Sequence, residues 1–285
     1  KKIIEEFKPD NVIGTGGYVC WPALKVASKM GIPTIAHESN ARPGLAIKQL
    51  QGSLDKILVN FKDTEKYIKA KEKVIHVGNP LRGGFGGLDY KSAREKLGIP
   101  GGKTYVLAFG GSLGAQRINE TVFEYMKHLD KQGGDVICHL ATGKNYYEDF
   151  STQFKAVGLD KNADLCMMEY IHDMHVRMSA ADIIVCRAGA MTISELAMMK
   201  KACVIIPSPN VVDNHQYKNA KVLSDAGAAV MLEESSLNDE SFAKAVDSLV
   251  SSPEKRRAIE ANVAQFARPD ANKLIYNEII KLTSK

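Results

Sequence analysis

Short runs of β-branched and other apolar residues alternate along the chain with segments in which apolar residues recur every three or four positions. The short runs predict ten strands, at 11–14, 34–38, 56–60, 74–78, 104–110, 136–141, 163–168, 182–186, 203–207 and 229–232. Helices are predicted between them, as after Gly114, where Ile118, Val122, Met126 and Leu129 share one side. Repeated strand and helix predict an α/β fold of two doubly wound, mostly parallel sheets with helices on both faces.

A glycine-rich stretch over 82–89 follows the fourth strand and precedes a predicted helix over 90–97. Such a stretch is typical of a boundary between domains, and 285 residues suit two of them. We expect a first domain over 1–81, to which a last helix over 271–282, within 268–285, returns, and a second over 82–267. Only four strands precede the boundary, and the chain opens without Met in an amphipathic helix, so the first domain is expected to be truncated at its N-terminus.

Hydrophobic content of 45% and charged content of 25% exclude a disordered chain, and no apolar run is long enough to cross a membrane. The five cysteines lack paired spacing and are interpreted as reduced core thiols of a cytosolic protein. The net charge of +5 lies wholly in residues 1–81, which hold 13 Lys/Arg against 8 Asp/Glu. An anionic partner would explain this charge, but so would a solvated face, and the charge alone favours the latter.

Two glycine loops stand where a strand becomes a helix, one around Gly14, Gly16 and Gly17, the other around Gly110, Gly111 and Gly114. Glycine there lets the backbone approach a phosphate, which the following helix N-terminus stabilises. Neither loop fits the dinucleotide fingerprint or the P-loop. Each alone has a purely steric explanation, but two loops facing one cleft between domains favour a phosphate-bearing ligand.

Two further segments offer ligand contacts. Thr192 and Glu195 satisfy a capping box, or else the amides of 190–192 bind a ligand oxygen and Glu195 binds a ribose diol; the spacing leaves both interpretations open. Gln216 and Asn219 lie three apart, on one helical face suited to sugar hydroxyls. A cluster over 37–44 follows a strand at the edge where open α/β sheets bind ligands.

Other kinds of site find little support. His172 and His175 lie three apart on a predicted helix without the carboxylate pattern of a metal site, and no nucleophile elbow occurs. Aromatic content of 7% with scattered lysines argues against nucleic acid as a partner.

In order and spacing, these motifs closely resemble the UDP-N-acetylglucosamine transferases of glycosyltransferase family 28. The matching segments are Gly14–Tyr18 with Pro22, 35–38 with Asn40, Pro43 and Gly44, 77–80 with Arg82, 110–115, 173–174, 186–195 and 216–220. The resemblance implies a GT-B fold and inverting transfer of N-acetylglucosamine from UDP-N-acetylglucosamine to the C4 hydroxyl of the muramyl sugar of lipid I. Lipid II would form in peptidoglycan synthesis, and so for cell-wall growth, shape and division, by a peripheral enzyme on the cytoplasmic side of the membrane, with no metal or other cofactor required.

The resemblance also implies roles for single residues. The backbone of Ile171 would face uracil, Glu195 would take the ribose hydroxyls, Ser112 and the second glycine loop would hold the α-phosphate, and Arg82 would lie near the diphosphate. The N-acetylglucosamine and neighbouring phosphate would be contacted by Asn40, Ala190, Met191, Thr192, Gln216 and Asn219. His215 stands where the family often has Gln, and Cys20-Trp21 replaces a usual Ser-Gly.

The family's loop G-G-T-x-G-H-x-x-P, which carries the favoured general base, is not found in this chain. We expect that His upstream of Lys1 and no catalytic residue within the chain, which alone could then be inactive. The alternatives are a catalytically silent nucleotide-sugar-binding fragment, a related GT-B enzyme with another lipid acceptor such as diacylglycerol, or a UDP-N-acetylglucosamine 2-epimerase.

Overall fold

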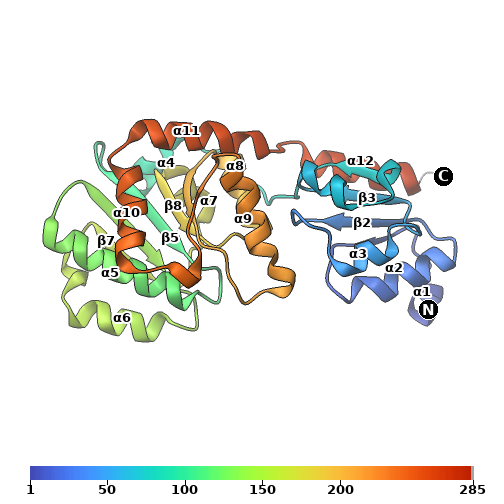
Figure 1. Ribbon diagram of the computed structural model, residues 1–285, viewed down its shortest axis with the longest axis horizontal. Helices are drawn as coiled ribbons and strands as arrows, with labels where there is room; N and C mark the ends of the chain where they lie inside the picture. Colours follow the sequence, from blue (N-terminus) through green and yellow to red (C-terminus); the bar gives the residue numbers. More distant parts are fainter. Residues whose placement is uncertain (284–285) are drawn as a thin grey trace.

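Two parallel β-sheets, each covered by helices on both faces, lie end to end in the computed structural model, which describes residues 1–283 (Figure 1). The sheets have four strands in the order β1-β2-β3-β4 and six in the order β10-β9-β8-β5-β6-β7. Every strand pairs in parallel with its neighbours. The expected α/β fold with parallel sheets is confirmed.

The four-stranded sheet and its helices form the first unit. Its elements are α1 (Lys2–Phe7), β1 (Val12–Gly14), α2 (Cys20–Lys29), β2 (Thr34–Glu38), α3 (Leu45–Leu50), β3 (Lys56–Val59), the 3-10 helix η1 (Lys62–Tyr67), β4 (Val74–His76) and α12 (Ala271–Thr283). One core on this sheet joins β2 and β3 to α2 and α3. On the other face, Ile35 and Leu58 pack against Leu274, Ile275 and Ile279 of α12, so the last helix returns to the first sheet as predicted.

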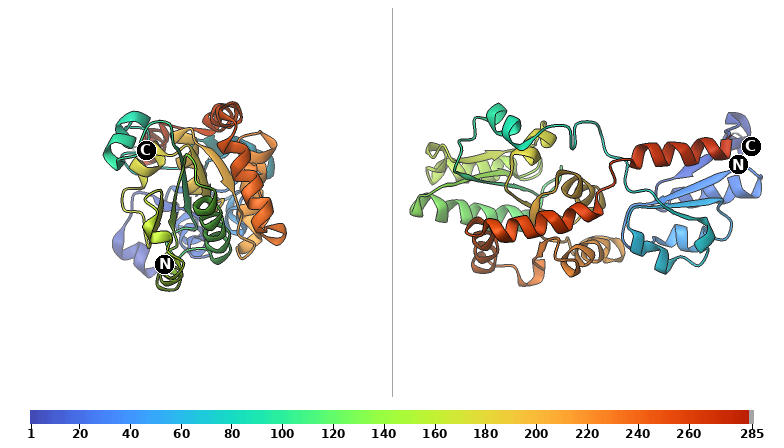
Figure 2. Two further views of the ribbon diagram at one scale, coloured as in Figure 1. Left: turned by 90° about the vertical axis from the view of Figure 1, so that its left-hand side faces the viewer. Right: turned by 90° about the horizontal axis from the view of Figure 1, so that it is seen from above.

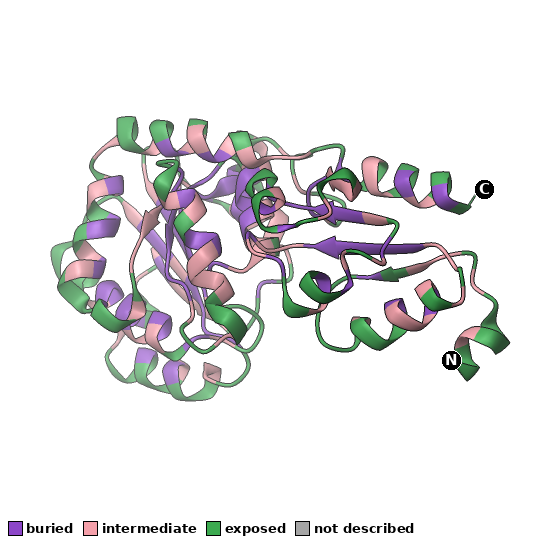
Figure 3. Ribbon diagram, turned by 45° about the vertical axis from the view of Figure 1, so that its right-hand side comes forward, coloured by how far each residue is buried: buried purple, intermediate pink, exposed green. Residues whose placement is uncertain are grey.

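The six-stranded sheet and its helices form the second unit. Its elements are α4 (Tyr90–Leu97), β5 (Thr104–Phe109), α5 (Gln116–Gln132), β6 (Val136–Ala141), α6 (Tyr147–Ala156), β7 (Leu165–Met168), α7 (Met174–Ala180), β8 (Ile183–Cys186), α8 (Ala190–Met199), β9 (Ala202–Ile205), α9 (His215–Asp225), β10 (Val230–Met231), α10 (Asp239–Val250) and α11 (Pro253–Val263). Two buried clusters cover its two faces. Figure 3 shows the buried positions concentrated on the central strands of both sheets.

All ten predicted strands are present, but several end earlier than predicted. The strand predicted over 203–207 is β9 and ends at Ile205, because Pro207 has no amide N–H to continue the ladder. The one predicted over 74–78 ends at His76, and Gly78 has φ +89°, outside the β region.

Two segments connect the units, one before α4 and one before α12 (Figure 2). The predicted boundary over 82–89 lies in the first, where the structure has turns and no regular element. The division into domains 1–81 with 268–285 and 82–267 stays a prediction, and residues 284–285 lie outside the described part.

The five cysteines are free thiols, three of them fully buried. Among the helices of residues 1–283, none combines the length and the apolar character that crossing a lipid bilayer requires.

Candidate substrate-binding site

The carboxyl ends of β5 and β8 lie side by side in the six-stranded sheet, with Phe109 opposite Cys186. From β5 the chain moves outward through β6 and β7, returns to β8, and continues in the other direction to β9 and β10. Loops that leave neighbouring strands toward opposite sides open a crevice, where open α/β sheets bind ligands. The loops here are 110–115 and 187–189, so the fold brings together two motifs that lie far apart in the sequence.

The second glycine loop is shaped by close backbone contacts. Gly114 has φ +88°, and a Cβ added there would lie 2.0 Å from the carbonyl oxygen of Thr142. The loop leads into the 17-residue helix α5, which no side chain caps. The first amide N–H groups of a helix have no partner within the helix, and they favour an anion at its N-terminus. The loop of Gly110, Gly111 and Gly114 therefore offers what a phosphate needs, and its role as a phosphate loop stays a prediction.

A polar cavity of about 530 Å³ opens beside this loop, and Gln216 lines it. Gln216 accepts a hydrogen bond from the amide of Ser208 at 2.9 Å, which leaves its side-chain amide NH₂ for a ligand. Sequence reasoning missed Arg117 and Glu234, which also line the cavity. Glu234 forms an ion pair with Arg187 across it, and no motif could have revealed a contact between positions so far apart.

Glu195 is a half-buried carboxylate that accepts no hydrogen bond from any described residue. Helix α8 begins at Ala190 after Gly189, and no side chain caps it, so Thr192 and Glu195 are its third and sixth residues. The capping-box interpretation is therefore wrong. Burial raises the pKa of Glu195 to about 7, and the charge of Arg82 opposes that rise. A half-buried acceptor without a donor is suited to a ligand's hydroxyl pair.

The start of α8 is tied to the first unit. Asn79 donates to the carbonyl of Ala190 at 3.2 Å and to Ser194 Oγ at 3.0 Å. Met191 is exposed and Thr192 half-buried. The backbone amides of Ala190, Met191 and Thr192 form the first turn of α8, whose N-terminus is uncapped and lies beside the switch point.

Ile171 lies in the loop between β7 and α7, with its side chain 4% exposed. Its backbone N–H forms none of the hydrogen bonds described for residues 1–283, so it is available to a base. Ser112 lines a cavity of about 560 Å³ together with the neighbouring Tyr170 and His172. His172 precedes α7 and His175 lies in it, so the prediction that one helix carries both is wrong. No group of three or more His, Cys, Asp or Glu in the described chain could hold a metal ion.

Asn219 is fully buried where the two units meet. Its Oδ1 accepts from the amide of Ala41 at 2.8 Å, and its Nδ2 donates to Asn40 Oδ1 at 3.1 Å and to the carbonyl of Ala188 at 3.3 Å. The side chain thus joins the loop after β2 to the loop after β8. Gln216 faces a cavity while Asn219 does not, so the two do not share one ligand-facing surface in this structure.

We expect Asn219→Ala to lower the free energy of unfolding by about 2 kcal/mol, because it leaves the Ala41 amide and the Ala188 carbonyl buried without partners. Urea denaturation measures the change. Asn272→Ala, which removes one exposed hydrogen bond to the carbonyl of Leu81, is the control and should cost less than about 1 kcal/mol. Equal midpoints for the two variants would contradict the assigned role of Asn219.

The first glycine loop lines a separate cavity of about 920 Å³, which Asn40, Trp21, Leu45 and His215 also border. Gly16 and Gly17 have φ of +101° and +74° with open space around them, whereas a Cβ on Gly14 would meet Leu24 at 2.5 Å. The two glycine loops therefore line two separate cavities, whereas the sequence analysis expected them to face one cleft. Residues 210–216 lie between their cavities and border both.

Glu38 organises the loop that holds Asn40, a role that sequence reasoning missed. Its side chain is 5% exposed and accepts from the amides of Asn40 at 3.0 Å and Gly44 at 2.7 Å. By accepting from two amides of the loop at once, the buried carboxylate holds the loop in one conformation.

Arg82, which was predicted to lie near a diphosphate, is exposed and forms no ion pair with the described residues.

Comparisons with known proteins agree over almost the whole chain. Residues 105–275 match the model of the glycosyltransferase family 28 C-terminal domain, and residues 1–59 match that of its N-terminal domain. The UDP-N-acetylglucosamine–N-acetylmuramyl-(pentapeptide) pyrophosphoryl-undecaprenol N-acetylglucosamine transferase of Acetivibrio thermocellus is 42% identical over 281 residues, which are 99% of this chain and 75% of that protein.

Solved structures give the same picture. MurG of Acinetobacter baumannii superposes with a TM-score of 0.78 and 27% identity over 98% of this chain and 76% of its own. MnaA of S. aureus, solved with UDP, superposes with a TM-score of 0.72 over 100% of this chain and 80% of its own, and at 16% identity it supports the fold alone.

Proposed function

This chain belongs to glycosyltransferase family 28, with the GT-B fold, and from that membership we propose that it transfers N-acetylglucosamine from UDP-N-acetylglucosamine to lipid I, forming lipid II. The muramyl C4 hydroxyl attacks the anomeric carbon of the α-linked donor from the face opposite UDP. A β(1→4) bond forms as the bond to UDP breaks, and the hydroxyl loses its proton to a general base. We propose the second unit, 82–267, as the donor side and the first as the acceptor side.

One arrangement supports the donor site above all: an unpartnered, half-buried Glu195 beside the same switch point as the uncapped N-terminus of α5. A uridine diphosphate presents what these groups lack, since its ribose donates two hydroxyls and its phosphates accept from amides. Ile171 offers a free backbone N–H to the base, and Gln216 and the first turn of α8 offer donors to the sugar. Asn219 contributes by holding Asn40 in place.

Negative charge develops on the diphosphate as the glycosidic bond breaks. The N-termini of α5 and α8 supply fixed positive charge near it, and the unpaired guanidinium of Arg82 adds a further positive charge. These groups perform the task that a metal ion performs in other transferases, so we propose that the reaction needs none.

The acceptor side faces the membrane in this proposal. Residues 1–81 carry the whole net charge of +5, and the cavity of the first glycine loop is bordered by the exposed side chains of Tyr18 and Leu45, which are 88% and 70% accessible. A basic surface with exposed apolar side chains favours the anionic cytoplasmic leaflet. We therefore propose peripheral binding there, which brings the chain to the lipid-linked acceptor.

Calorimetry with the whole chain should show UDP binding at least about 10-fold more tightly than CMP or NAD, because the backbone of Ile171 is placed to contact the base, which differs among the three nucleotides. Transfer of labelled N-acetylglucosamine from UDP-N-acetylglucosamine to lipid I in detergent tests the reaction itself. Equal affinity for the three nucleotides would contradict the donor site. Selective UDP binding without transfer would instead indicate a nucleotide-sugar-binding protein.

A further inference from the structure

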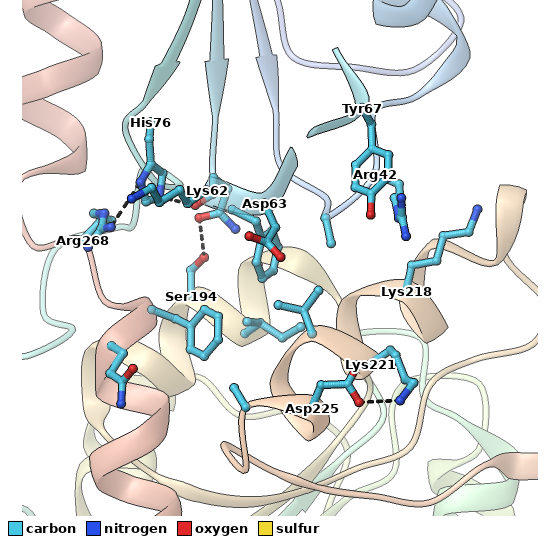
Figure 4. A pocket seen from close by; sticks show the side chains of 18 of the residues that line it. Arg42, Lys62, Asp63, Tyr67, His76, Ser194, Lys218, Lys221, Asp225 and Arg268 are labelled. Atoms are coloured by element: carbon cyan, nitrogen blue, oxygen red, sulfur yellow. Dashed lines mark hydrogen bonds and ion pairs between the residues drawn. The ribbon is translucent and has the colours of Figure 1, made fainter. Parts of the chain in front are cut away.

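A pocket of about 630 Å³ lies between the two units, and we call it the hinge pocket (Figure 4). Arg42, Lys62 and His76 line it from the first unit, Lys218 and Lys221 from α9, and Arg268 from the segment before α12. None of its lining residues borders the cavity beside the second glycine loop, so it is distinct from the proposed donor site.

The hinge pocket carries uncompensated positive charge. Lys221 pairs with Asp225, and Lys218 pairs with Asp213 at 2.7 Å. Arg42, Lys62 and Arg268, in contrast, have no carboxylate partner among residues 1–283, and Asp63 on the pocket wall pairs with Lys66. Three unpaired cations around one concave site leave a positive potential, which favours a multiply charged anion.

Local contacts hold two of these cations in place. The guanidinium carbon of Arg42 lies 3.3 Å from the centre of the Tyr67 ring, so the ring fixes its plane and leaves its N–H edge free. Arg268 donates to Nδ1 of His76 at 3.1 Å, and His76 Nε2 lies 2.9 Å from the carbonyl oxygen of Asn60. The imidazole is thus a neutral acceptor for Arg268, in accord with its pKa, which burial and Arg268 lower.

Lys62 and Arg268 lie on the same side of the pocket, beside His76, as Figure 4 shows. Arginine and lysine together are the residues that proteins most often use for phosphate, one by its planar donors and the other as a point charge. The size of the pocket suits a small organic ligand, and Phe61 and Phe266 supply an apolar wall.

We propose that the hinge pocket binds a phosphate-bearing small molecule, with its phosphate between Lys62 and Arg268. Since the pocket is built from both units, the ligand contacts both and restrains their relative position. The pocket would then be an effector site, separate from the donor site.

Calorimetric titration of inorganic pyrophosphate into the whole chain, saturated with UDP and at low ionic strength, tests the proposal. Pyrophosphate should still bind, and Lys62→Gln should weaken it about 10-fold, the effect of one charged hydrogen bond. Lys69→Gln, which removes an exposed charge outside the pocket, is the matched control and should change affinity less than about 2-fold. Lys62→Arg should retain binding.

Loss of pyrophosphate binding in the presence of UDP would overturn the proposal, because the anion would then occupy the donor site. Equal weakening by Lys62→Gln and Lys69→Gln would also overturn it, since the attraction would be that of net charge alone. Should UDP itself fail to bind, the comparison of Lys62→Gln with Lys69→Gln still tests the hinge pocket.

Discussion

Alanine at Gly114 is expected to lower the free energy of unfolding by more than about 3 kcal/mol and to abolish UDP binding. The new Cβ would lie 2.0 Å from the carbonyl oxygen of Thr142 and 2.7 Å from the Tyr146 ring, so the backbone itself has to move. A residue other than glycine is also strained at φ +88°. Both effects displace the loop that leads into α5.

Gly111→Ala is the matched control, because Gly111 has a similar φ of +99° in the same loop but no atom within 4 Å of an added Cβ. It should show the backbone strain alone, about 1–2 kcal/mol. Urea denaturation gives the stabilities, and calorimetry gives the UDP affinities. If the two alanine variants lose equal stability, the close approach of Gly114 to Thr142 does not hold the loop.

Replacing Glu195 with Gln is expected to weaken uridine binding about 10- to 100-fold and, at pH 8, to stabilise the unliganded protein by about 1–2 kcal/mol. Burial raises the pKa of this carboxyl from its ordinary 4.5 to about 7. The folded chain therefore binds more protons than the unfolded chain between these values, and its stability falls as pH rises through them. Glutamine removes the free-energy cost of ionising this carboxyl in the folded chain. Because Glu195 is partly exposed to solvent, that cost is smaller than the full pKa difference would give.

The affinity of the unmodified chain for uridine should rise with pH, in the opposite direction to its stability. The two ribose hydroxyls donate to the ionised carboxylate of Glu195. Because its pKa is about 7, this form is the minority below pH 7. Binding at pH 6 should be about 10-fold weaker than at pH 8. Uridine is the probe because, unlike UDP, it has no phosphate that titrates in this range.

Glu240→Gln changes an exposed carboxylate in the first turn of α10 and is the control for both measurements. It should leave uridine affinity and its pH dependence unchanged. A flat pH profile for the unmodified chain, or unchanged affinity in Glu195→Gln, would refute the assignment of Glu195 to the ribose.

The elements of the fold could be predicted because their signals are local. Six to ten neighbouring residues with β-branched or 3.6-residue patterns decide whether a segment becomes β5 or α5, as Thr104–Phe109 and Gln116–Gln132 show. Strand ends were less predictable, because hydrogen bonding to the neighbouring strand decides them. The family, too, followed from the sequence, since its motifs occur in order along the chain and the comparisons confirm it.

The candidate site divides in the same way. Glycine loops and Glu195 were recognisable from residue type and position, but the role of Asn219 was not, because its partner Ala41 lies 178 residues away. Spacing could not decide between a cap and a ligand contact at Glu195, since both use the same residues. The position of α8's first residue decided it.

The sequence by itself thus determined the parallel sheets, the glycine turns and the family, because backbone conformation and motif order are properties of neighbouring residues. Only the tertiary structure decided which loops meet at the switch point, that Glu195 is half-buried without a partner, and that Arg42, Lys62 and Arg268 line one pocket. Burial and electrostatic potential depend on every group within several ångströms, and those groups come from segments that only the folded chain brings together.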